Sequence, residues 1–91
     1  MFIAVCYDIP DDKRRTRVSK TLEGFGYRVQ KSVFECDIEL PLYEKMRKRI
    51  TKIINVEEDS VRYYCFCQTC VSKITISGLG EVKREKPFFF V

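Results

Sequence analysis

The first segment of the chain is a continuous apolar run. Residues 2–7 carry no charged side chain, and Asp8 and Pro10 end the run. An apolar run of this length, bounded by turn residues, is typical of a strand that is buried on both faces in the middle of a sheet. We therefore expect the chain to begin with a central strand.

Residues 12–25 show the spacing of an amphipathic helix. Asp11 and Asp12 stand at its start, where short polar side chains cap helices. Gly24 and Gly26 end the pattern. The apolar positions recur at intervals of three or four residues, at Val18, Leu22 and Phe25. The segment is predicted to be the first helix.

Two strands and a second helix follow. The pattern is strand-like at residues 27–29 and 32–38. Pro41 then occupies a position that suits the first turn of a helix. The apolar stripe of this helix consists of Tyr43, Met46, Ile50, Ile53 and Ile54, and its opposite side carries Lys45, Lys48, Arg49 and Lys52. The second helix is therefore predicted to be amphipathic and basic.

The remaining elements are predicted strands. Residues 61–67 alternate as a fourth strand, and residues 72–77 suggest a short fifth strand with Ile74 and Ile76 on one face. The order βαββαβ plus a C-terminal strand indicates an α+β, ferredoxin-like fold. Both helices should cover one face of an antiparallel sheet and leave the other face available for a partner. We expect one domain over residues 1–78 and a tail over residues 79–91 that contacts a partner or a second copy.

The length of the chain favours a homodimer. A chain of 91 residues with 45% apolar side chains forms one small domain, and a domain of this size buries only about two-thirds of the surface that its unfolded chain exposes. Three consecutive phenylalanines, at residues 88–90, would be an aggregation hazard in an isolated copy. Association with a second copy would supply stability and cover apolar surface.

The sequence disfavours a membrane or secreted location and any chemistry that needs histidine. No apolar run approaches the roughly 18 residues of a membrane span, and the N-terminal residues lack the features of a signal peptide. We therefore expect a cytoplasmic protein with no membrane partner. The chain contains no histidine, which excludes Ser-His-Asp, Cys-His and histidine-metal chemistry. Carboxylates, thiolates, lysine, tyrosine and arginine remain for any reaction.

The five cysteines leave three readings open. Their odd number and the expected reducing compartment argue against a disulfide framework. Cys67 and Cys70 form a CxxC motif close to Cys65. Two thiols are half of a tetrahedral zinc site, and the chain has no second CxxC. Structural or incidental thiols are the favoured reading, with metal binding and redox function as alternatives.

Positive charge is concentrated in one stretch. Residues 13–31 hold seven basic residues and one acidic residue, a local charge of +6 against +4 for the whole chain. Such a stretch predicts contacts with the phosphates of nucleic acid, and the sequence lacks the aromatic motif of an RNA recognition domain. The alternative is an ordinary solvated helix face. The candidate nucleic-acid-binding residues are Lys13, Arg14, Arg15, Arg17, Lys20, Arg28 and Lys31.

Several motifs resemble the CRISPR-associated protein two family. They are YDIPDDKRR at residues 7–15, LEGFG, RVQ and SVFEC within residues 22–36, and EDSVRYY at residues 58–64. The resemblance covers residues 1–77. It implies a cytoplasmic homodimer with a ferredoxin-like fold that acts with the CRISPR integrase subunit in acquiring spacers. It also implies metal-dependent endonuclease activity on RNA or DNA.

The resemblance further implies roles for individual residues. Asp8 looks like the residue of the family that binds magnesium, with Tyr7 beside it. The residues that look like those lining the dimer cleft are Arg15, Arg17, Arg28, Ser32 and Phe34. Together these seven residues are the candidate catalytic set. The tail corresponds to the region of the family that pairs with the integrase subunit.

Three functional hypotheses follow. The first is a magnesium-dependent endonuclease. One carboxylate per chain is a small ligand set for a metal ion, so this hypothesis has two copies of Asp8 converge at a dimer axis. The second is a non-catalytic scaffold that bridges integrase subunits and binds duplex DNA, or single-stranded RNA, by its phosphates. In that case Asp8 merely caps a turn before Pro10. A metal chaperone is disfavoured, because its CxxC should follow the first strand and here follows the fourth.

Overall fold

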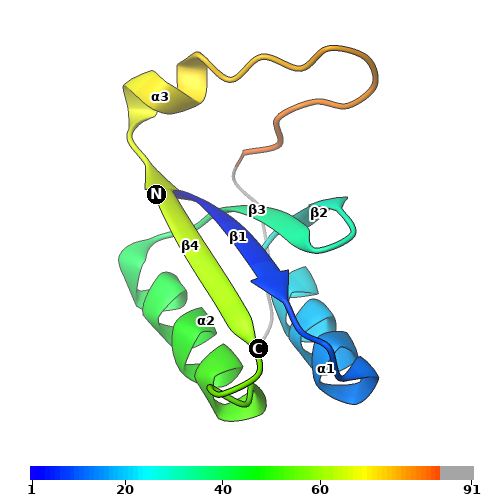
Figure 1. The fold of residues 1–91 in the computed structure, drawn as a ribbon. Coiled ribbons are helices and arrows are strands. Elements are labelled where there is room, and N and C mark those ends of the chain that lie inside the picture. Colours follow the sequence, from blue (N-terminus) through cyan, green and yellow to red (C-terminus); the bar gives the residue numbers. More distant parts are fainter. Residues whose placement is uncertain (85–91) are drawn as a thin grey trace.

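The computed structural model describes residues 1–84, and this part of the chain contains four strands and three helices (Figure 1). In chain order these are β1 Phe2–Asp8, α1 Asp12–Glu23, β2 Tyr27–Gln30, β3 Val33–Asp37, α2 Leu40–Ile53, β4 Ser60–Phe66 and α3 Gln68–Ser72. The order βαββαβ predicted from the sequence is confirmed, and the fold is α+β with a ferredoxin-like plan.

The four strands form one antiparallel sheet in the order β2-β3-β1-β4. β1 lies between β3 and β4, which confirms that its apolar run is a central strand. Its register pairs Asp8 with Ser60 and Phe2 with Phe66. The C-terminal end of β1 therefore lies beside the start of β4, and the start of β1 lies beside the end of β4.

The core lies between the sheet and the helices α1 and α2, which cover the same face (Figure 1). Side chains alternate across a strand, so every second residue of β1 and β3 points to this face. The core cluster includes Ile3, Val5, Tyr7, Phe34 and Cys36 of the sheet and Val18, Leu22, Met46 and Ile50 of the two helices. The apolar stripes predicted for both helices thus face the core.

The ends of α1 show why the sequence starts and stops a helix there. The Asp11 side chain accepts a hydrogen bond of 2.9 Å from the backbone N–H of Arg14, which makes Asp11 the N-cap. Gly24 is the C-cap, and Gly26 follows at the entry to β2. A Cβ atom at Gly26 would lie 2.4 Å from the Glu35 carbonyl oxygen. Only glycine therefore fits where the chain passes so close to β3.

The predicted fifth strand at residues 72–77 is wrong. Residues 68–72 form α3 instead, and residues 73–84 contain neither helix nor strand. Cys67 caps the helix by accepting from the backbone N–H of Cys70, and such local bonding favours a turn over an extended chain. Gly78 and Gly80 then take φ values of +100° and +121°, which a regular strand does not contain.

The proposed tail of residues 79–91 is described only as far as residue 84, and residues 85–91 lie outside the described part. Leu79 is almost fully exposed. The helices found in residues 1–84 are too short or too polar to cross a lipid bilayer.

Candidate functional site

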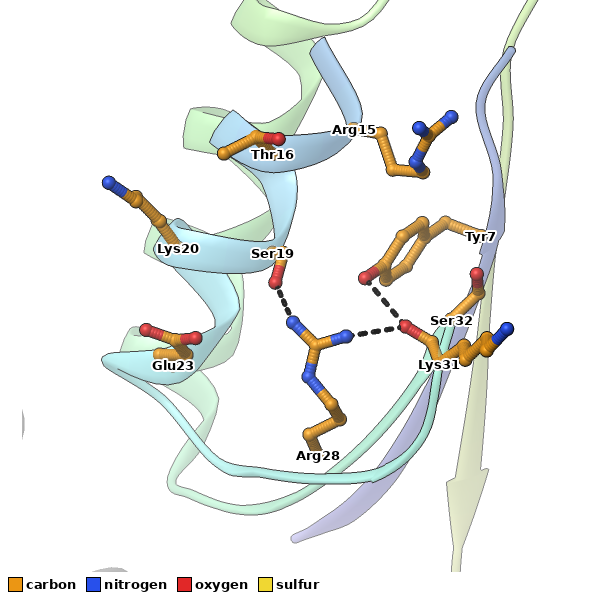
Figure 2. Close-up of a pocket in the computed structure, with 9 residues that line it drawn as sticks. All are labelled: Tyr7, Arg15, Thr16, Ser19, Lys20, Glu23, Arg28, Lys31 and Ser32. Atoms are coloured by element: carbon orange, nitrogen blue, oxygen red, sulfur yellow. Dashed lines mark hydrogen bonds between the residues drawn. The ribbon is translucent and has the colours of Figure 1, made fainter. Parts of the chain in front are cut away.

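Most of the candidate residues meet at one cavity between α1, the end of β1 and the turn that joins β2 to β3 (Figure 2). This cavity, called the cationic cavity below, has a volume of about 440 Å³. Its lining residues are Tyr7, Arg15, Thr16, Ser19, Lys20, Glu23, Arg28, Lys31 and Ser32. Four basic side chains and one carboxylate give it a net positive charge.

Arg28 spans the floor of the cationic cavity. Its guanidinium donates a hydrogen bond of 2.7 Å to the Lys31 carbonyl oxygen and another to the Ser19 hydroxyl. It also lies over the ring of Phe34, with 5.2 Å between the guanidinium carbon and the ring centre. A planar guanidinium held by hydrogen bonds and by an aromatic face has little freedom. Arg28 thus joins α1 to the turn between β2 and β3.

Tyr7 closes the same floor from β1. Its hydroxyl donates a hydrogen bond of 3.2 Å to the Lys31 carbonyl oxygen, and its backbone N–H donates to the Ser32 carbonyl oxygen at 3.0 Å. The Tyr7 ring stacks on Phe34, with ring centres 6.4 Å apart. Phe34 is fully buried, so it supports the floor from below and does not line the cavity.

Arg15 forms the wall nearest the loop between β1 and α1. It donates hydrogen bonds to the carbonyl oxygens of Ile9, at 2.9 Å, and Pro10, at 3.3 Å, and it pairs with the Asp12 carboxylate. These contacts hold the loop against the first turn of the helix. They leave the Arg15 guanidinium fixed in position and about two-fifths exposed.

The lysines are the exposed cations of the cavity. Lys20 and Lys31 are exposed, and neither ammonium group forms an ion pair within residues 1–84. Because unpaired ammonium groups next to a preorganised guanidinium attract phosphate oxygens, the cavity can bind a phosphate group of a polymer or of a small ligand.

Asp8 does not belong to the cationic cavity. It is exposed at the end of β1, and alternation along the strand sends it to the sheet face opposite Tyr7. Among residues 1–84, no three metal-binding side chains lie close enough together to hold an ion. An exposed carboxylate nevertheless suits Mg²⁺, which takes one or two carboxylates together with waters and substrate phosphates.

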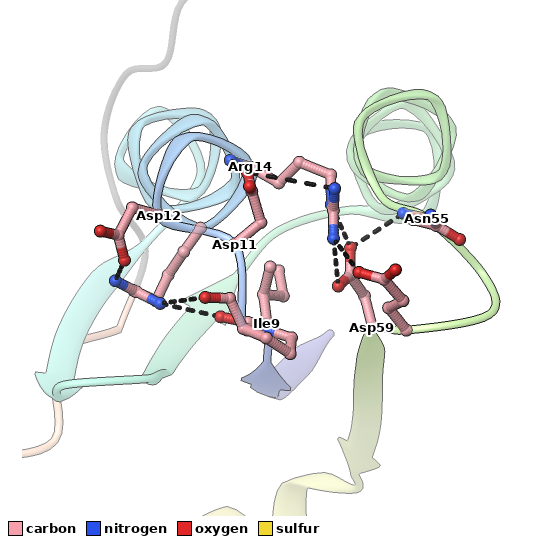
Figure 3. A network of polar contacts seen from close by, with 9 residues as sticks. Ile9, Asp11, Asp12, Arg14, Asn55 and Asp59 are labelled. Carbon is pink, nitrogen blue, oxygen red and sulfur yellow. Dashed lines mark hydrogen bonds and ion pairs between the residues drawn. The ribbon is translucent and has the colours of Figure 1, made fainter.

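The Arg14 guanidinium is paired with acidic side chains of the same chain (Figure 3). Its guanidinium donates to Asp59 at 2.8 and 3.1 Å and to Glu58 at 3.0 Å. The Asp59 side chain is fully buried and also accepts from the backbone N–H of Asn55 at 2.8 Å. The Arg14 hydrogen bond holds the pKa of Asp59 below its ordinary value. Arg14 therefore fastens α1 to the loop between α2 and β4.

The remaining predicted cations lie on the outer surface. Lys13 and Arg17 are exposed on α1, outside the cationic cavity. The basic side of α2 is also exposed, at Lys45, Lys48, Arg49 and Lys52. Both helices of the layer thus present positive charge to solvent. The structure adds Thr16, Ser19 and Glu23 to the candidate site, and no sequence signal marked these three.

The open face of the sheet lacks a helical cover. Its residues include Ala4, Cys6, Glu35 and Tyr64, which lie side by side on β3, β1 and β4. Tyr64 is 44% exposed. Partial burial raises the pKa of Glu35. This face is mixed in polarity, and residues 74–83 lie against its β2 edge, where Lys83 stands over the Tyr27 ring.

The fold and the cavity define a small α+β domain that presents a cluster of cations beside an antiparallel sheet. The chain belongs to the family described as CRISPR associated protein Cas2, whose model matches residues 1–74. The resemblance found in the sequence motifs is thereby confirmed.

Individual relatives agree with this membership. The chain is 47% identical over 81 residues to a protein of Chloroflexus aurantiacus named CRISPR-associated endoribonuclease Cas2 1, with 88% of this chain and 87% of the relative covered. The crystal structure of Streptococcus pyogenes Cas2 has a TM-score of 0.75 and 31% identity, with 86% of this chain and all of that chain covered. A chain of a partial Cas6-RT-Cas1–Cas2 complex has a TM-score of 0.72 and 32% identity, with 82% and 88% covered.

Proposed function

We propose that this protein binds the phosphodiester backbone of nucleic acid in CRISPR adaptation, together with an integrase subunit. The observation that carries the proposal is the convergence of Arg15, Lys20, Arg28 and Lys31 on one cavity of a Cas2-family chain. The integrase partner is supported by the structural similarity to a chain of a complex that includes Cas1. The five free thiols suit the reducing cytoplasm in which we place the protein.

The charges of the helix layer support backbone contact and not the reading of bases. The cations of the cationic cavity continue onto α1 through the exposed Lys13 and Arg17. Phosphate contacts of this kind position a protein on a duplex or a single strand without sequence preference. Duplex DNA is the expected ligand, and single-stranded RNA is the second candidate.

The functional unit of the proposal is a homodimer joined through the open face of the sheet. Ala4 and Tyr64 lie at the centre of that face, and Tyr64 is largely exposed in a single copy. Burial of this face in a dimer would add buried surface to a domain whose short chain buries little surface by itself. Asp8 belongs to the same face, and a two-fold axis that passes near the end of β1 would bring its two copies toward one another.

The proposal includes metal-dependent phosphodiester cleavage, with Asp8 as the residue that would hold Mg²⁺. Such an ion polarises a phosphoryl oxygen and lowers the pKa of water when it is bound. The cationic cavity contributes by fixing the backbone of the substrate through the Lys20 and Lys31 ammonium groups. The name of the relative from Chloroflexus aurantiacus, an endoribonuclease, supports this activity.

A non-catalytic scaffold is the second candidate function. It is favoured by the fact that residues 1–84 of one copy contain no cluster of three possible metal ligands. A scaffold needs only the phosphate contacts and the partner surfaces. Both functions predict that a variant of Asp8 still binds nucleic acid. Only the enzyme predicts that the variant loses a cleavage activity of the wild type.

Binding is tested with a double variant and a control of equal charge. Lys20→Ala with Lys31→Ala removes the two exposed lysines of the cavity, whereas Lys48→Ala with Lys52→Ala removes two exposed lysines of α2. We expect the cavity variant to bind labelled duplex DNA about tenfold or more weakly than the α2 variant at moderate salt, with a salt slope smaller by about two. Equal losses in both variants would show that only net charge matters.

A further inference from the structure

Two cysteine side chains stand apart from the proposed function. Cys67 follows the last residue of β4 and caps α3, and Cys70 lies within α3. Both are exposed, and their sulfur atoms are 3.4 Å apart. The backbone N–H of Cys70 also donates to Cys67 Sγ at 3.4 Å. The CxxC motif of the sequence is therefore a close pair of accessible thiols.

The two thiols differ in character. Hydrogen bonds from the Cys70 backbone and then from the Cys70 thiol lower the pKa of Cys67. The neighbouring Cys67 sulfur raises the pKa of Cys70. A thiolate is the attacking species in thiol–disulfide exchange, and a neighbouring thiol resolves the mixed disulfide that forms. The arrangement makes Cys67 the attacking residue and Cys70 the resolving residue.

The other cysteines are placed differently. Cys36 is buried in the core and Cys6 is half-buried on the sheet. Cys65 is exposed, but it lies on β4 beside the Tyr43 hydroxyl, and its hydrogen bond contributes to the raised pKa of that tyrosine. Among the five thiols, Cys67 and Cys70 are thus the pair that the backbone of α3 brings into contact.

We propose that Cys67 and Cys70 are a reversible dithiol–disulfide site that reacts with small disulfides of the glutathione class. An S–S bond is about 2.05 Å long, so a shift of about 1.4 Å from the 3.4 Å contact closes it. The site lies at the end of β4, beside the start of β1, whereas the cationic cavity lies at the other end of β1. The proposal is therefore independent of nucleic-acid binding.

The exchange proceeds in two balanced steps. The Cys67 thiolate attacks one sulfur of the small disulfide, whose S–S bond breaks and releases one thiolate. The Cys70 thiol then gives up its proton, and its sulfur attacks Cys67 Sγ and displaces the second small thiol. Two protein thiols are oxidised to one disulfide, and the small disulfide is reduced to two thiols.

Oxidation would act on the segment that follows β4. The new bond would fix the first turn of α3, and α3 holds the described end of the chain through a hydrogen bond of 2.6 Å from Arg84 to Gln68. The α3 turn is otherwise held by the buried Val71 side chain and by local hydrogen bonds, including one from the Ser72 hydroxyl to the Thr69 carbonyl oxygen. A Cys67–Cys70 disulfide would therefore make the rigidity of α3 depend on the redox state of the cell.

Variants of the full chain test the site in glutathione buffers, after treatment with a chelator and measurement of bound zinc. Oxidised glutathione should convert the wild type to a form with a Cys67–Cys70 disulfide, identified by mass spectrometry and peptide mapping. Cys70→Ser should accumulate a glutathione adduct on Cys67, because the resolving thiol is gone. Cys65→Ser, the matched control, should behave as the wild type. In the reduced wild type, iodoacetamide should modify Cys67 about tenfold faster than Cys65.

Three results would overturn the proposal. One is a wild type that keeps glutathione adducts on its exposed cysteines without forming the internal bond. Another is a disulfide that includes Cys65. The last is zinc retained in stoichiometric amount through the chelator, with oxidation blocked, which would make the thiols metal ligands.

Discussion

Tyr7 and Arg28 donate hydrogen bonds to the same acceptor, the Lys31 carbonyl oxygen, at 3.2 and 2.7 Å. The two donors come from the central strand and from an edge strand. Their shared acceptor sits in the turn between β2 and β3, so this turn is fixed from two sides. The floor of the cationic cavity is thereby preorganised before any phosphate enters.

Removal of one donor should loosen this turn without opening the core. Tyr7→Phe keeps the stacked ring and deletes the hydroxyl, and we expect the free energy of unfolding to fall by about 1 kcal/mol. Urea denaturation measures the loss. Thr51→Val is the control, because it deletes an exposed hydroxyl of α2 at nearly constant shape and should change stability little. An equal effect in both variants would remove the special role given to the Lys31 carbonyl.

The Arg14–Asp59 pair predicts a pH dependence of stability. The pKa of Asp59 is lower in the folded chain than in the unfolded chain, so the pair contributes fully above the ordinary carboxyl range of about 4. Its contribution is lost as the pH falls through the lowered pKa. Asp59→Asn should lower the Tm by several degrees at pH 7 and by progressively less as the pH falls below 4. Glu58→Gln, which changes the more exposed partner, should have a smaller effect.

The open face of the sheet predicts the oligomeric state. The wild type should sediment as a dimer at micromolar concentration, and Tyr64→Asp should sediment as a folded monomer because it places a charge at the centre of the joined faces. Val56→Asp makes the same change in an exposed loop position and should remain a dimer. A Tyr64→Asp protein that stays dimeric would place the interface elsewhere.

Asp8 separates the enzyme from the scaffold. Asp8→Asn keeps the shape of the side chain, so folding should be unchanged, while magnesium-dependent cleavage should fall by about a hundredfold or more. The measurement is the cleavage rate of RNA and DNA by preparations shown to be free of host nuclease. Asp8→Ala should show the same loss. Cleavage that persists in both variants would assign the activity to another residue, and binding without cleavage in the wild type would favour the scaffold.

The sequence predicted the fold where local pattern and tertiary environment agree. The apolar run of β1, the helical spacing of α1 and the Asp11 cap all describe contacts that neighbouring residues specify. The prediction failed at residues 72–77, where the alternation of Ile74 and Ile76 resembles a strand. The cap of α3, which starts a helix at residue 68, outweighs that alternation in the described chain.

The sequence predicted the positive charge of the site but not the contacts that each charged side chain makes. Clustered basic residues marked the stretch of residues 13–31, yet only the structure separates Arg14, which is bound to Asp59, from Lys20 and Lys31, which face the cavity. Arg14 and Asp59 are 45 positions apart in the sequence, and sequence spacing carries no information about such a contact. Ser19 is likewise placed by Arg28.

The most direct test of the central claim, that nucleic acid binds at the cationic cavity, is an NMR titration of the labelled protein with a short DNA duplex. We predict that the largest amide shifts occur at Thr16, Lys20, Lys31 and Ser32, and that they shrink as salt is added. Amides around Lys48 and Lys52 on α2 should change little. Shifts confined to α2 or α3, with the cavity amides unmoved, would contradict the account.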